Sequence, residues 1–444
     1  MWDNRAVQFT ENSAHYLDDL NLSMLKIDNA IHFNNTIFQK SVECHSTTFY
    51  KVAYFESSNF SGPAYFWSSE FNGDAYFESS NFSGPANFRD SRFNGPADFG
   101  DSRFNGDADF GHSKFNGDAD FRYSKFNRDA VFESSNFSGP ADFCPSNFNG
   151  SAYFGHSNLN STANFGDSEF NRDAIFESSN FSGPADFRYS KFKGDAVFGD
   201  SKFNGSADFC PSNFNGSANF TSSKFNKTAD FRESHFEKES TFNDAKFIGI
   251  ASFNRTRFVD NALFLNTTFN NILYLTRSKY DKLYIRWENI NKNGKLGYDD
   301  TEYLLLIQNF KNLGFFEDAN ECYYQYRKAH LSKVDGLNWI FDGAALCLYG
   351  YGVQPSYPMF CAIILILLFW LIYLNLNLEM SPRETLKFSI EVLLSGAGPF
   401  SPIPSDLSKA RNYENLALVE KIAGSVLFAL FIIALGKTII GDVV

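Results

Sequence analysis

Phenylalanine recurs through the first two thirds of the chain at separations that alternate between five and six residues. The repeated unit is about eleven residues long and reads A-x-F-x-x-S-x-F-x-G-x, from about residue 22 to residue 285. A period of eleven could also belong to a right-handed coiled coil. Each unit, however, carries Gly, Asn, Ser and often Pro, which are unfavourable inside helices. The pattern therefore predicts a solenoid of short extended segments and turns, with each Phe pointing inward.

Units with Ala two positions before a Phe, as in Ala53 and Phe55, resemble the pentapeptide-repeat proteins over roughly residues 22–285. This resemblance implies a right-handed, four-sided β-helix. One extra residue follows every second pentapeptide here, so each coil is expected to take about 22 residues, giving about 11 coils. We expect residues 1–21 to cap the N-terminal end, because an open end would otherwise pair with other chains.

The repeats offer few candidates for chemistry. Asp recurs directly before Phe, at Asp98, Asp109, Asp120 and Asp142. Because Asp and Asn alternate there, an ordinary outward-facing position is favoured over a calcium ladder. His112 and His156 fall in turn positions at unequal intervals, which does not favour a metal site. Cys144 and Cys210 share a face but lie three coils apart, too far for a disulfide bond.

A helical period replaces the eleven-residue frame after residue 285. Within a connector that spans residues 286–335, the apolar spacing predicts helices over 301–313 and 316–331. Gly314 lies between them and provides a stop signal. The connector is therefore expected to contain a pair of helices joined by a short turn.

Residues 336–444 are expected to form a membrane domain. Residues 357–377 and 419–440 are each long and apolar enough to cross about 30 Å of hydrocarbon as a helix. Before them, residues 336–350 carry aromatic side chains of the kind that favours the membrane surface, so this segment is predicted to be a helix lying on that surface. Basic residues before the first span and Lys437 near the end of the second favour a cytoplasmic β-helix. The chain is therefore predicted to be a multi-pass protein of the cell membrane, in contact with the lipid bilayer.

The segment between the two spans is the most informative for function. It begins with SPRE at 381–384, a capping box with Ser381 at the N-cap and Glu384 at position N3. The helix predicted over 382–394 is too short to span a membrane, which favours a re-entrant helix. A Gly-containing loop follows at 395–400. Irregular backbone at this depth is tolerated where it lines a water-filled cavity, and a helix C-terminus directed at that cavity would favour cations.

This order of span, short helix, Gly-containing loop and span resembles the two-transmembrane pore-loop channels of the potassium-channel superfamily, over about residues 355–444. The stretches NFKNLGFFEDANECYYQYR and GYGVQP are similar to the connector of prokaryotic proteins that fuse pentapeptide repeats to such a channel. The resemblance implies a homotetramer that conducts monovalent cations. The residues in register with the family's filter T-V-G-Y-G-D are Leu394, Ser395, Gly396, Ala397, Gly398 and Pro399.

Both filter glycines are retained, whereas the Thr hydroxyl, the Tyr and the Asp are not, so the resemblance does not specify potassium selectivity. Gly424 and Gly436 in the second span are candidates either for gating hinges or for helix packing contacts. Glu391 could bind ions, although one turn before the loop a bond behind the filter is favoured.

The net charge of the chain and the motifs that it lacks argue against several other classes of function. A net charge of −12 argues against a nucleic-acid partner. The acidic excess of the repeats, about −6, is mild and interspersed and does not favour the DNA mimicry of some pentapeptide-repeat proteins. Neither a phosphate loop nor a nucleophile–His arrangement nor a metal-ligand cluster is recognisable, so no enzyme and no cofactor are predicted.

The sequence thus predicts a cation channel whose cytoplasmic β-helix serves assembly, ligand sensing or binding of a protein partner. The alternative is a membrane-anchored β-helical scaffold that binds a protein partner and conducts no ions. The capped short helix discriminates between them, because a simple tether has no need of it.

Overall fold

The computed structural model describes residues 13–291, 295–297, 299–376, 380–395 and 414–440. The chain forms two compact units, Met1–Glu302 and Tyr303–Val444.

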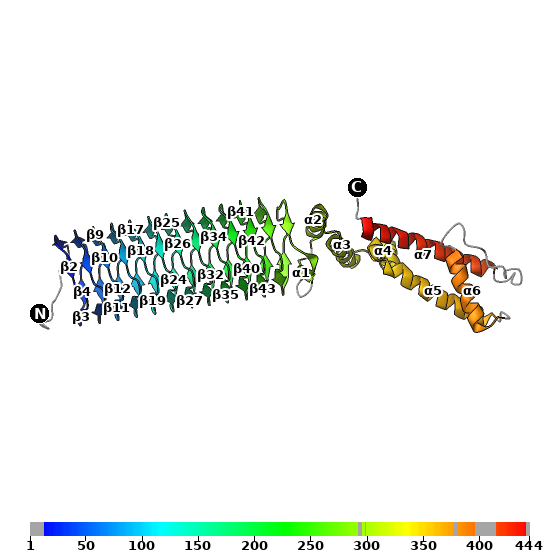
Figure 1. Cartoon of the computed structure of the whole chain (residues 1–444), viewed down its shortest axis with the longest axis horizontal. Helices are drawn as coiled ribbons and strands as arrows, with labels where there is room; N and C mark the ends of the chain where they lie inside the picture. The colour runs from blue at the N-terminus through cyan, green and yellow to red at the C-terminus, as the bar shows by residue number, and fades with distance from the viewer. Residues whose placement is uncertain (1–12, 292–294, 298, 377–379, 396–413, 441–444) are drawn as a thin grey trace. The chain divides into compact units, whose positions relative to one another are not determined.

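The first unit is a parallel β-solenoid of about 12 coils (Figure 1). Nearly all of its strands are two residues long, and they form four sheets, two of 12 strands and two of 13. The sheets run from β1 (His15–Tyr16) to β45 (Arg257–Phe258), from β2 (Leu20–Asn21) to β49 (Leu283–Tyr284), from β3 (Lys26–Ile27) to β47 (Thr268–Phe269) and from β4 (Ile31–His32) to β50 (Lys295–Leu296). The β-solenoid predicted from the repeats is therefore confirmed, and its four sheets agree with the four sides that the resemblance implies.

Each strand pairs with the strand one coil further along at a fixed register. Ala64 pairs with Ala86 and Phe71 with Phe93, so one coil takes 22 residues, as the frame predicted. Strand pairing begins at His15, inside the range expected to form a cap, and continues to Leu296, beyond the predicted end of the repeats at residue 285. For this reason the solenoid has about 12 coils rather than the 11 expected.

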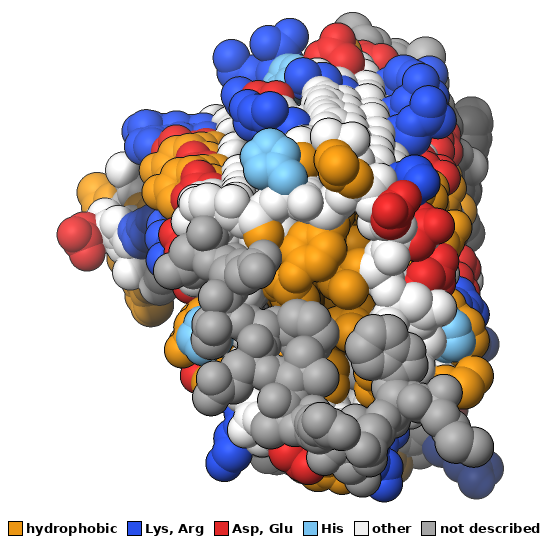
Figure 2. Space-filling view, turned by 90° about the vertical axis from the view of Figure 1, so that its left-hand side faces the viewer, with side chains coloured by type: hydrophobic (Ala, Val, Ile, Leu, Met, Phe, Trp, Pro, Cys, Tyr) orange, Lys and Arg blue, Asp and Glu red, His pale blue; other side chains and the backbone are white. Residues whose placement is uncertain are grey.

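Stacked phenylalanine rings fill the interior of the solenoid. The rings of Phe55 and Phe77 are 4.8 Å apart and inclined by 4°, and the rings of Phe60 and Phe82 are 4.6 Å apart. These side chains are at most 1% exposed. In the end-on view of Figure 2, hydrophobic side chains occupy the middle of the face and charged side chains lie toward its edges. Burial of each ring contributes about 2 kcal/mol or more, which offsets the ordering of the polar corners.

The serine of each unit is buried because it satisfies backbone groups of neighbouring coils. The Ser80 hydroxyl donates to the carbonyl oxygen of Phe55 at 2.6 Å, and the Ser80 N–H donates to the Ser102 hydroxyl at 3.2 Å. From Met24 onward, nearly every eleventh residue has a left-handed backbone, with φ near +60°. His112 and His156 occupy this turn position, as the frame predicted.

The C-terminal end of the first unit buries an acidic side chain. Here α1 (Trp287–Asn291) precedes β50, and α2 (Asp300–Asn312) follows it. Glu302 on α2 is 2% exposed. Its carboxylate accepts hydrogen bonds from the Leu275 N–H and, at 3.1 Å, from the Thr276 hydroxyl. Burial raises the pKa of Glu302 to about 7 despite these two hydrogen bonds.

The second unit is helical. After the predicted Gly314 turn, where φ is +75°, its helices are α3 (Phe316–Leu331), α4 (Leu337–Tyr349), the 3₁₀ turn η1 (Gly350–Gly352), α5 (Ser356–Asn375), α6 (Pro382–Ser395) and α7 (Glu414–Ile440). By length and composition, α5 and α7 could each cross a membrane. Among the described residues, α4 buries none of its side chains and exposes Leu337, Trp339, Ile340 and Phe341.

Candidate functional site

The short helix α6 begins with a formed capping box. The Ser381 N–H donates to Glu384 Oε2 at 2.8 Å, and the Glu384 N–H donates back to Ser381 Oγ at 3.4 Å. Pro382 is the first helical residue, where its missing N–H has no cost. These contacts fix the start of α6 at Pro382, so that α6 is a helix separate from both apolar helices.

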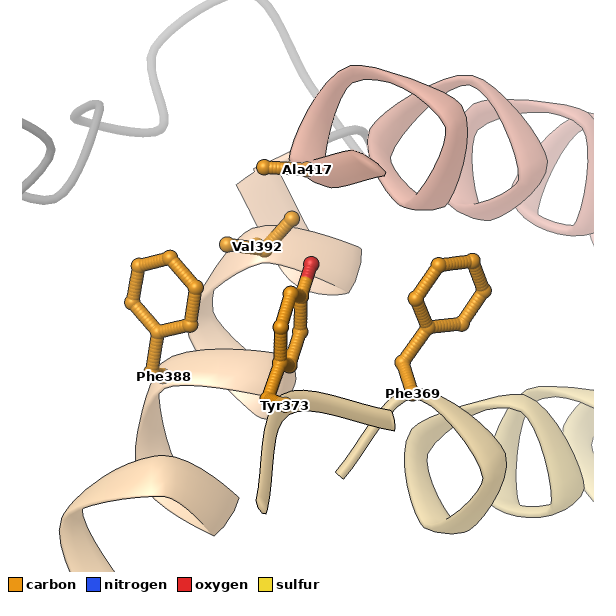
Figure 3. Packing of buried hydrophobic residues seen from close by; sticks show 5 residues of the cluster. All are labelled: Phe369, Tyr373, Phe388, Val392 and Ala417. Carbon is orange, nitrogen blue, oxygen red and sulfur yellow. The ribbon is translucent and has the colours of Figure 1, made fainter. Parts of the chain in front are cut away.

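A hydrophobic cluster packs α6 against both long helices (Figure 3). Phe369 and Tyr373 come from α5, Phe388 and Val392 from α6, and Ala417 from α7. The rings of Tyr373 and Phe388 meet edge to face, with centroids 5.3 Å apart. The helix α6 is therefore packed against both apolar helices rather than lying loosely outside the bundle.

A carboxyl group is buried where the same three helices meet. Glu420 on α7 is 0% exposed. Its Oε2 lies 2.7 Å from the Tyr373 hydroxyl of α5, and its Oε1 lies 2.5 Å from the Ser389 hydroxyl of α6. The Ser389 hydroxyl also lies 3.2 Å from the carbonyl oxygen of Ile366. These contacts join all three helices through one polar cluster, which we call the Glu420 cluster (Tyr373, Ser389 and Glu420).

The two candidate hinge glycines differ in their surroundings. A Cβ atom placed on Gly424 would overlap the carbonyl oxygen of Leu393, so α6 and α7 approach closely there. A Cβ on Gly436 would meet no atom within 4 Å. The structure thus gives Gly424 a packing contact with α6, one of the two roles considered for it.

The residues in register with a filter are described only in part. Leu394, 55% exposed, and Ser395, 5% exposed, form the end of α6, and the Ser395 hydroxyl donates to the Val392 carbonyl oxygen at 2.7 Å. Gly396, Ala397, Gly398 and Pro399 lie outside the described residues. The filter assignment therefore stays a prediction.

The aspartates of the solenoid close local turns. Asp98 Oδ1 accepts from the Gly100 N–H at 2.8 Å, and Asp142 Oδ1 accepts from the Cys144 N–H at 3.0 Å. Burial raises the pKa of Asp98 and of Asp142. Within the described ranges, no group of three or more His, Cys, Asp or Glu side chains could hold a metal ion.

Reasoning from sequence missed the Glu420 cluster. Ser389 and Tyr373 are 31 and 47 residues from Glu420, so their spacing does not show that they meet. One signal was available: Glu420 is an acid close to the start of an apolar run, and Ala417 and Gly424 lie one helical turn to either side of it. An acid on the packed face of a membrane helix needs polar partners.

Comparison with protein families supports the solenoid. The family model described as pentapeptide repeats (9 copies) matches residues 33–81, 77–125, 165–210 and 231–279. The first unit therefore contains pentapeptide repeats, followed by a helical unit with two helices that could cross a membrane. No curated protein and no solved structure matches the chain.

Proposed function

We propose that the protein is a cation-conducting membrane channel in which α5 and α7 span the bilayer and α6 is a re-entrant pore helix. The packing of a capped α6 against both α5 and α7 carries this proposal. With 14 residues, α6 is about 21 Å long and cannot cross the hydrocarbon. A loop that merely joined two anchors would need neither a capping box nor a polar cluster that holds it to both of them.

In this proposal the negative end of the α6 dipole and the backbone carbonyls of residues 395–398 face a water-filled path. One such loop cannot enclose a pore, so several copies must assemble, and the channel resemblance implies four. The β-solenoid would lie in the cytoplasm as a rigid module for assembly or regulation. The basic residues near the two spans support a cytoplasmic solenoid, because Arg327, Lys328 and Lys333 precede α5 and Lys437 lies near the end of α7.

Ion flux from liposomes that contain the purified full-length protein tests the proposal. We expect flux under potassium or sodium gradients, and its loss in the double variant Gly396→Val, Gly398→Val. A matched control is Gly343→Val in α4, where a Cβ would meet no atom within 4 Å. Equal flux from all three proteins would contradict a pore at this loop. A folded wild-type protein without flux would favour the membrane-anchored scaffold.

A further inference from the structure

The side chains of the Glu420 cluster can supply only a fixed number of protons for the hydrogen bonds between their oxygen atoms. Tyr373, Ser389 and Glu420 are each 0% exposed. Each of the two hydroxyl groups has one proton to donate. Three oxygen–oxygen contacts each need one proton to form a hydrogen bond: Tyr373 to Glu420, Ser389 to Glu420, and Ser389 to the Ile366 carbonyl.

An ionised carboxylate leaves one of these contacts without a proton. Both hydroxyls would then donate to Glu420, and Ser389 would have none left for Ile366. A neutral Glu420 completes the set, because its proton on Oε1 donates to Ser389, which in turn donates to Ile366. Tyr373 donates to Oε2 in either case.

Among the described residues, no positive charge compensates an ionised Glu420. Tyr373 is the titratable group that α5 places against it. The ionisable side chains of α6 are all exposed: Arg383, Glu384, Lys387 and Glu391. Of these, Lys387 lies with its Nζ 3.6 Å from Glu391 Oε1. Lys421, the next residue on α7, is half-buried. Glu420 forms no ion pair within the part of the chain that the structure describes. An unpaired carboxylate is costly to bury in a bilayer, whereas a hydrogen-bonded acid is not.

We propose that Glu420 holds a proton and, as a neutral acid, positions α6 between α5 and α7 in its conducting arrangement, so that loss of this proton at alkaline pH stops conduction. The regulatory part rests on the proposed channel function. Ser389 lies one turn before Leu393, whose carbonyl oxygen closely approaches Gly424, and Ser395 is the last residue of α6, next to the Gly-containing loop. A charge introduced at Glu420 would therefore displace the segment that sets the position of that loop.

Infrared spectroscopy tests the proton directly. Glu302, whose pKa is about 7, would contribute a protonated carboxyl band of its own, so the reference protein is the full-length Glu302→Gln chain in lipid. It should show the carbonyl stretch of a protonated carboxyl group at neutral pH, and the band should disappear as pH is raised. The band should be lost when Glu420→Gln is added and retained when Glu317→Gln, an exposed glutamate at the start of α3, is added instead. A reference protein without such a band at neutral pH, or a band retained after Glu420→Gln, would overturn the assignment. The titration of the reference protein decides this even where the Glu420 variant does not fold.

The pH dependence of flux tests the regulation. Above the pH at which half of the Glu420 residues are ionised, wild-type flux should fall about tenfold or more per pH unit, because the protonated fraction falls by that factor. Glu420→Gln should conduct without this dependence, since its amide can donate to Ser389 and accept from Tyr373. An unchanged pH profile in Glu420→Gln would refute the regulation and leave the pore intact. A wild type that conducts at no pH would refute the channel and its regulation, while the infrared band still tests the proton.

Discussion

The buried Glu302 predicts that the C-terminal coil loses stability as pH rises. The pKa of Glu302 is raised from 4.5 to about 7, chiefly because the carboxyl group is buried. Between these two values the folded coil binds a proton that the unfolded coil releases. The contribution of Glu302 to stability is therefore complete below pH 4.5, decreases as pH rises, and is lost above pH 7. At 1.36 kcal/mol per pKa unit, the loss is about 3 kcal/mol.

Hydrogen–deuterium exchange of the full-length protein in detergent measures this local stability. In peptides that cover residues 272–284, Glu302→Gln should match the wild type near pH 4.5 and exchange about a hundredfold more slowly near pH 8. Comparison at equal pH cancels the intrinsic effect of pH on exchange. Glu78→Gln, an exposed site within the solenoid, is the control and should match the wild type at both values. Identical exchange in Glu302→Gln and wild type near pH 8, or a wild type that gains protection with rising pH, would refute the reasoning.

Two further stability predictions follow from packing. The ring of Phe121 stacks between those of Phe99 and Phe143, with centroid distances of 5.0 and 4.8 Å. Phe121→Ala should therefore lower the free energy of unfolding by about 3–5 kcal/mol, measured by urea unfolding followed by circular dichroism. The control Tyr123→Ala replaces a side chain that is 58% exposed and should change stability by about 0.5 kcal/mol or less. Equal effects of these two changes would contradict an aromatic core. Gly424→Val should cost about 1–3 kcal/mol in thermal unfolding in detergent, because a side chain there meets the Leu393 backbone, whereas Gly436→Val should be nearly neutral; the reverse order would contradict the α6–α7 contact.

The solenoid could be predicted from sequence because its structure is repeated locally. Every unit presents Phe, Ala and Ser at the same separations, so the eleven-residue unit follows from spacing alone. The resemblance to pentapeptide-repeat proteins implies that two units make one coil, and the register of Ala64 with Ala86 confirms the coil length. The capping box at Ser381 was equally accessible, since its two partners are three residues apart. Where the solenoid begins was harder to see, because His15 and Tyr16 pair with β5 (Ile37–Phe38) without matching the repeat.

The interactions that position α6 could not be predicted in the same way. The Glu420 cluster depends on how three helices pack, and the apolar runs of α5 and α7 show only that these helices can lie in a membrane. Gly424 and Gly436 look alike in sequence, and only the approach of Leu393 distinguishes them. Glu302 likewise lies on a helix of ordinary composition, and its burial follows from its contacts with Leu275 and Thr276.

Single-channel recording tests most directly whether α6 and its loop form a pore. The full-length protein would be incorporated into planar bilayers and recorded at both polarities, at acidic and neutral pH. The proposed function predicts discrete, cation-carried current steps that the double variant Gly396→Val, Gly398→Val abolishes and Gly343→Val retains. A correctly folded wild type that gives no current steps, or steps that persist unchanged in the double variant, would contradict it.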